Sequence, residues 1–73
     1  MPHAKRAVRS VLIPHSASNE AYEYFEFRRW NGQIATYDAR DTLSAPMSDE
    51  TRAMMEKLLF EASTKRGEWI EYA

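Results

Sequence analysis

The chain has 73 residues, which is enough for one domain with a small core. It contains no cysteine, which excludes disulfides and thiolate metal sites, and its formal net charge of −1 is unlike the basic balance of a nucleic-acid-binding domain. It has no apolar run of membrane-spanning length and no signal-peptide pattern at its start. We therefore expect a soluble, cytoplasmic protein with no membrane partner.

Charge is distributed unevenly along the chain. Residues 1–18 contain three basic residues and no acidic one, whereas residues 19–73 contain seven basic and eleven acidic residues. This distribution favours a domain that binds another protein, or one that binds nothing charged.

The first predicted strand covers residues 7–13, which are rich in β-branched and apolar side chains and are followed by Pro14. Within it Val8, Ser10 and Leu12 share one face. We expect that face to meet the core.

A second and a third strand are predicted at residues 21–30 and 33–39. Between them stands the pair Asn31-Gly32, which indicates a two-residue hairpin loop of type I′, with positive φ at both positions.

This loop length fixes the strand register and therefore the two faces of the hairpin. It places Arg29 opposite Ile34 and Phe27 opposite Thr36. Phe25, Phe27 and Ile34 then share one face, which we expect to be the core face because it carries no tyrosine hydroxyl. The other face, expected to be open, carries Tyr22, Tyr24, Glu26, Arg28, Trp30, Ala35 and Tyr37.

An amphipathic helix is predicted over residues 49–66, after a linker at residues 40–47. Ser48 is a capping residue at its start, and Gly67 can supply the left-handed residue that commonly ends a helix. Its apolar stripe, at i, i+3, i+4 and i+7, consists of Met55, Leu58, Leu59 and Ala62.

A fourth strand is predicted at residues 68–72, where Ile70 and Tyr72 share a face and Trp69 lies on the other. The predicted fold is a single α+β domain over residues 1–73. An antiparallel sheet of three to four strands in the order β-β-β-α-β carries one amphipathic helix on one face. The terminal strand can join either edge of this sheet.

Acidic residues are the main candidates for binding a partner, because carboxylates that gather on one surface suit a basic protein. Glu20 and Asp38 have no evident structural task and are the stronger candidates. The remaining three acidic candidates are Glu23, Glu26 and Asp41.

Two aromatic residues are further candidates for partner binding. Phe60 lies opposite the apolar stripe of the helix, so it is either an exposed anchor for a partner or a second copy, or it is covered by the linker or the last strand. Tyr24 lies on the hairpin face that is expected to be open. The expected state is a monomer or a weak homodimer.

Direct binding of nucleic acid is the alternative function, and it is less favoured than binding of a protein partner. Arg28 and Arg29 among aromatic side chains could grip phosphates and stack bases. However, Glu23 and Glu26 lie in the same predicted strand and would repel phosphate.

The two histidines, His3 and His15, lie in no pattern that indicates a catalytic base or a metal site. We therefore predict no enzyme activity, no catalytic residue, no metal and no cofactor.

Three segments together resemble small anti-CRISPR proteins of mobile elements, in particular a family that inhibits type I-F effectors. They are Tyr24-Phe25-Glu26-Phe27, residues 54–62 of the helix, and Gly67-Glu68-Trp69-Ile70. The resemblance implies an inhibitor that covers a basic, DNA-recognising surface of a CRISPR effector subunit by steric and electrostatic occlusion. Glu20 and Asp38 best match the family's acidic contacts. The chain departs from the family in its Asn-Gly hairpin, its basic start, and Arg28 and Arg29.

Overall fold

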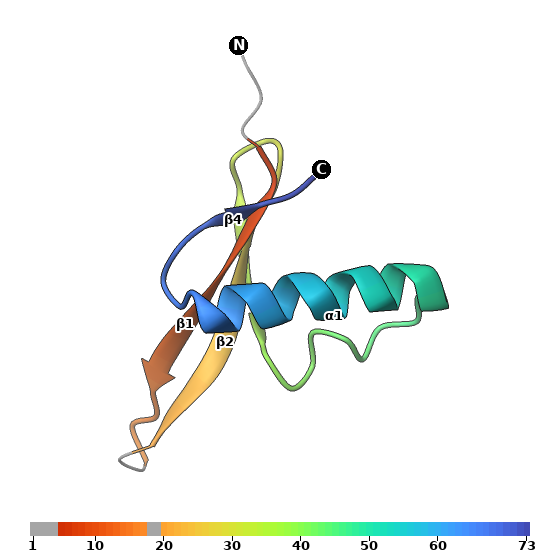
Figure 1. Ribbon diagram of the computed structural model, residues 1–73. Coiled ribbons are helices and arrows are strands. Elements are labelled where there is room, and N and C mark those ends of the chain that lie inside the picture. The colour runs from red at the N-terminus through yellow and green to blue at the C-terminus, as the bar shows by residue number, and fades with distance from the viewer. Residues whose placement is uncertain (1–4, 18–19) are drawn as a thin grey trace.

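The computed structural model describes residues 5–17 and 20–73 of the chain (Figure 1). They form a four-stranded antiparallel sheet with strand order β3-β2-β1-β4, crossed by one helix. This confirms the predicted α+β class. The elements are β1 (Ala7–Pro14), β2 (Ala21–Arg28), β3 (Ile34–Asp38), α1 (Asp49–Thr64) and β4 (Ile70–Glu71). The terminal strand joins the β1 edge, so β1 and β2 form the centre of the sheet.

The core lies between α1 and the central strands. Val8 and Ser10 of β1 are fully buried, as the alternation of that strand predicts. Val8, Phe25, Leu59 and Ala62 form the buried cluster. The third residue predicted on the core face of β1, Leu12, is instead 49% exposed, because the end of β1 extends beyond the helix (Figure 1).

The hairpin loop between β2 and β3 is one residue longer than predicted. The Gly32 N–H donates to the Arg29 carbonyl at 2.8 Å, and the Arg29 N–H donates to the Gln33 carbonyl at 2.8 Å. Gly32 has a φ of 88°, but Asn31 has no positive φ, which a type I′ turn would require. This pattern is that of a three-residue loop, in which a turn is followed by one left-handed glycine.

The longer loop shifts the register and exchanges the faces of β3. Phe27 pairs with Ala35, and Arg28 pairs with Ile34. The predicted core residue Ile34 is therefore on the open face, where it is 51% exposed. Tyr37, predicted on the open face, shares the helix side with Phe27, and their rings are 5.7 Å apart. The predictions for Ile34, Ala35 and Tyr37 were thus wrong, because a slip of one residue turns every side chain over.

Helix α1 begins as predicted. The Ser48 hydroxyl accepts a 3.1 Å hydrogen bond from the Thr51 N–H, which satisfies one free donor of the first turn. The helix ends at Thr64, two residues before the predicted end. Gly67 does adopt a left-handed conformation, with a φ of 90°, and its N–H donates to the Ser10 carbonyl at 2.8 Å.

The last strand is shorter than predicted, but its faces are as expected. Ile70 and Tyr72 pack against the core cluster. Trp69 lies on the opposite side, where its ring is 4.4 Å from the Arg9 guanidinium and 5.1 Å from that of Arg28. The backbone pairing continues past β4, because the Tyr72 N–H donates to the Arg6 carbonyl at 2.9 Å.

Candidate protein-binding surfaces

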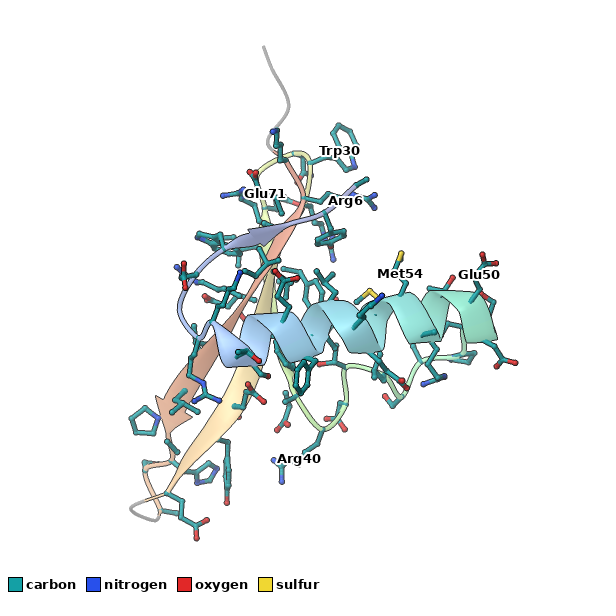
Figure 2. All side chains as sticks on the ribbon, viewed as in Figure 1. Arg6, Trp30, Arg40, Glu50, Met54 and Glu71 are labelled. Carbon is teal, nitrogen blue, oxygen red and sulfur yellow. The ribbon has the colours of Figure 1, made fainter. Side chains whose placement is uncertain are left out.

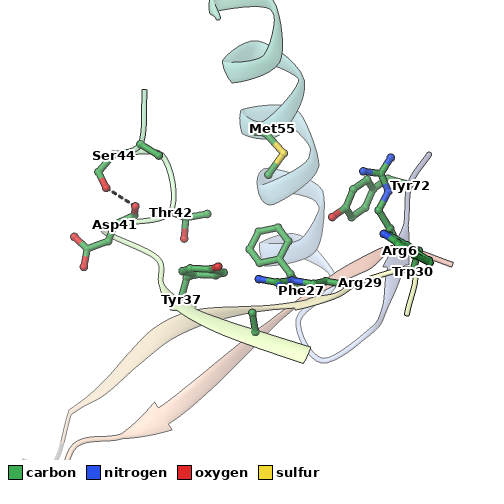
Figure 3. Close-up of a pocket in the computed structure, with 12 residues that line it drawn as sticks. Arg6, Phe27, Arg29, Trp30, Tyr37, Asp41, Thr42, Ser44, Met55 and Tyr72 are labelled. Atoms are coloured by element: carbon green, nitrogen blue, oxygen red, sulfur yellow. Dashed lines mark hydrogen bonds between the residues drawn. The ribbon is translucent and has the colours of Figure 1, made fainter. Parts of the chain in front are cut away.

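A groove of about 740 Å³ lies on the helix side of the sheet (Figure 3). It forms because α1 packs over β1 and β4 and leaves part of the β2–β3 hairpin uncovered. Phe27 and Tyr37 of the hairpin line the groove, and Met55 of the helix lies across from them. The remaining lining residues are Arg6, Arg29, Trp30, Ala35, Asp41, Thr42, Ser44, Ala45 and Tyr72.

The two ends of the groove carry opposite charge. Figure 3 shows Arg6, Trp30 and Tyr72 on one side of Phe27, Arg29 next to Phe27, and Asp41 on the side of the linker. The Arg6 guanidinium is 5.2 Å from the centre of the Tyr72 ring. The groove is therefore aromatic in its middle, basic at one end and acidic at the other.

Two of the acidic candidates, Glu26 and Asp38, lie on the open face of the sheet, and each is paired with an arginine. Glu26 forms an ion pair with Arg9. Asp38 binds Arg40 at 2.7 Å, and hydrogen bonds from the Arg40 side chain and backbone lower the pKa of Asp38 from 3.8 to about 2. Tyr24 is half-buried and pairs with Asp38 across the strands. The open face therefore carries arginines beside its carboxylates.

The other acidic candidates lie elsewhere, so the five do not form one patch. Glu20 is exposed just before β2, and its carbonyl accepts a 2.9 Å hydrogen bond from the His15 N–H. Asp41 is exposed at the acidic end of the groove.

Glu23 lies on the helix side of β2, where it joins the helix to the sheet. Its carboxylate accepts hydrogen bonds of 2.6 Å from both the Ser10 and Ser63 hydroxyls, and one of 3.3 Å from Arg66. Partial burial raises the pKa of Glu23, but these hydrogen bonds and the charge of Arg66 outweigh it, so the pKa lies below its usual value. These contacts give Glu23 a structural role.

Phe60 is 76% exposed, so neither the linker nor the last strand covers it. Met54 is also exposed, on the half of α1 that extends past the sheet (Figure 2). Phe60 therefore stays available as an anchor for a partner.

The alternative arginine pair is divided between the two faces of the sheet. Arg28 lies on the open face, where it binds Glu71 at 3.3 Å and the Lys5 carbonyl at 3.0 Å. Arg29 lines the groove on the helix side. The charge of Arg28 is thus compensated within the chain, and the two arginines do not act on one surface.

Of the two histidines, only His15 lies within the described residues. The ring of His15 packs edge-on against Tyr22 at 4.9 Å, and His3 lies outside the described residues. Within residues 5–17 and 20–73, no three side chains of metal-binding type are grouped together, and no helix is long and apolar enough to span a membrane.

The groove was missed by sequence analysis. It combines residues from the hairpin, the linker and the helix with Arg6, which precedes β1, and Tyr72, which follows β4. The prediction that Trp30 lies on the open face was wrong, because Trp30 belongs to the hairpin loop and lines the groove, where it is 56% exposed. A tryptophan next to a predicted turn is a signal that could have indicated a contact site. Comparison with protein-family models, curated proteins and solved structures gives no significant match.

Proposed function

We propose that the chain is a small protein-binding inhibitor that acts by covering a surface of its partner. The observation that supports this is the uncovered aromatic groove beside α1. Trp30 and Tyr37 are exposed in this groove, next to Phe27 and Met55. Contiguous exposed apolar side chains with a polar rim are typical of protein interaction sites.

The mechanism needs no chemistry in the inhibitor. A rigid, preformed surface loses little conformational freedom on binding, so a few buried anchors can supply most of the affinity. Phe27 and Tyr37 lie on paired strands and are held by the sheet.

The narrower proposal concerns the partner, and it is based on the resemblance to anti-CRISPR proteins. It names a subunit of a type I CRISPR effector, whose basic DNA-recognising surface the chain would block inside the host cell. Glu26 and Asp38 lie on the open face, opposite the groove, so the partner would contact Glu20 and that face in addition to the groove. Because Glu26 and Asp38 are already paired with arginines, we expect steric covering to contribute more than charge.

The first experiment is a pull-down with the tagged protein from host lysate, with and without nuclease, read by mass spectrometry. A stoichiometric protein partner that resists nuclease is expected. Tyr37→Ser should reduce its recovery, whereas Leu12→Ser, also at an exposed apolar site but outside the groove and not on the open face, should not. Circular dichroism must show that both variants fold. Recovery that depends on nucleic acid would contradict the proposal.

The narrower proposal has its own test. A purified type I-F effector is mixed with its target DNA and with increasing amounts of the protein, and DNA binding is followed by gel shift. Inhibition at near-stoichiometric amounts is expected. The triple variant Glu20→Lys/Glu26→Lys/Asp38→Lys should weaken this inhibition. An unchanged gel shift with wild-type protein would reject this partner while leaving the general proposal to the pull-down.

A further inference from the structure

We propose that the groove binds a short peptide segment of the partner in which an apolar side chain is followed by acidic residues. This inference rests on the general proposal that the groove binds a protein partner, not on the CRISPR effector as that partner, and it states which chemistry the groove recognises. The acidic residues would meet Arg6 and Arg29, and the apolar side chain would lie over Phe27 and Tyr37.

The middle of the groove is suited to an apolar side chain. The rings of Phe27 and Tyr37 meet edge to face, so the groove presents both ring faces and ring edges. Met55 lies across from them on the helix (Figure 3). Methionine is unbranched and polarizable, and it adapts to side chains of different shape.

The arginines at the basic end of the groove differ from the other described arginines in their hydrogen bonding. Within residues 5–17 and 20–73, five arginines are hydrogen-bonded to a carboxylate, a carbonyl or a hydroxyl: Arg9, Arg28, Arg40, Arg52 and Arg66. In that same part of the chain, the guanidinium groups of Arg6 and Arg29 have no such acceptor, and both line the groove. Their donors are available for a carboxylate, which a guanidinium binds through two parallel hydrogen bonds.

Asp41 sets the direction of the peptide and disfavours nucleic acid. It lies across the groove from the two arginines (Figure 3). A peptide can place its acidic residues at the basic end and a neutral or basic residue near Asp41. A nucleic-acid strand carries a phosphate at every step, so it would bring negative charge against Asp41 as well.

The test is an NMR titration of the isotope-labelled protein with acetyl-Leu-Phe-Glu-Glu-amide. Saturable shifts are expected for the Trp30 indole N–H and for the backbone amides of Arg29 and Tyr72. The Arg6→Gln/Arg29→Gln variant should bind about tenfold more weakly. Arg40→Gln is the control, because Arg40 is exposed but lies on the open face over Tyr22. It should bind like the wild type.

Three outcomes would overturn the peptide proposal: no saturable shifts at the groove, equal affinity for acetyl-Leu-Phe-Lys-Lys-amide, or equal affinity of the double variant. Tighter binding of a short oligothymidine at the same residues would also overturn it, in favour of a nucleic-acid site. If Tyr37→Ser still abolishes partner capture while the acidic peptide does not bind, the inhibitor proposal stands and only the peptide chemistry fails.

Discussion

The Glu23 carboxylate of β2 accepts a 2.6 Å hydrogen bond from the Ser63 hydroxyl of α1, 40 residues further along the chain. The same carboxylate binds the Ser10 hydroxyl of β1 and the Arg66 guanidinium. One side chain thus joins the last turn of the helix to both central strands, at the end of the sheet away from the hairpin tip.

Replacing Glu23 should destabilise the fold. Glu23→Gln keeps the size of the side chain but removes its charge, so the contacts with Ser10, Ser63 and Arg66 weaken. We expect the free energy of unfolding to fall by about 1 kcal/mol, as for one or two charge-assisted hydrogen bonds. Urea unfolding followed by circular dichroism measures this. Glu56→Gln, at an exposed helical position, is the control and should change stability by less than about 0.5 kcal/mol.

Stability should also fall in acid. The folded-state pKa values of Glu23 and Asp38 lie below their ordinary values of 4.5 and 3.8, that of Asp38 at about 2. The unfolded chain therefore takes up protons before the folded chain does. The stabilisation from both groups is complete above pH 4.5 and is lost as the pH falls towards 2.

Unfolding midpoints in urea between pH 2 and pH 7 test this expectation. The wild type should show a flat region above pH 5 and a decline below it. Asp38→Asn should show a smaller decline below pH 3.8, because its side chain no longer titrates. A midpoint of the wild type that stays constant down to pH 2 would contradict both shifts.

Gly32 should resist substitution because of its backbone conformation alone. A Cβ at this position would meet no atom within 4 Å, but its φ of 88° is costly for any residue with a Cβ. Gly32→Ala should lower the free energy of unfolding by about 1 kcal/mol. Gly32→Asn should cost less, because asparagine tolerates the left-handed region better. Equal stability of the alanine variant and the wild type in thermal unfolding would mean that the loop has a different conformation.

Truncating two neighbouring residues of α1 should have very different effects on the free energy of unfolding. Leu59 is 6% exposed within the core cluster, so Leu59→Ala should cost about 2–5 kcal/mol. That is a large share of the roughly 4–11 kcal/mol expected for a domain of this length. Phe60→Ala should leave stability within about 0.5 kcal/mol of the wild type. Chemical unfolding of the two variants under the same conditions checks the pair, and a costly Phe60→Ala would mean that something covers Phe60.

The elements of this fold could be predicted because their signals are local. Ser48, the acidic first turn and the apolar stripe around Leu59 lie within one helix, and the β-branched and aromatic residues lie within single strands. The hairpin register was harder, because Asn31-Gly32 fits both a two-residue and a three-residue loop. The longer loop puts Tyr37 against Phe27 and leaves Ile34 in solvent, and the local sequence does not distinguish the two arrangements.

The candidate site depends on contacts between distant segments. That Glu23 shares a face with Phe25 follows from simple alternation, but its partners Ser63 and Arg66 come from the other half of the chain. The groove exists because β4 joins β1 rather than β3, which draws the helix away from the hairpin. By sequence alone the last strand could join either edge of the sheet, so the position of the groove could not be predicted.

The pairing of Val8 with Ile70 has a consequence for how the chain is made. During synthesis β1 and β2 can form a hairpin early, because they are adjacent in sequence. The helix that covers Val8 and the strand that flanks it are translated after both of these strands, and the pairing of Val8 with Ile70 closes a long loop. Until α1 and β4 have left the ribosome, the nascent hairpin of β1 and β2 therefore keeps its apolar side uncovered and open to association with other chains.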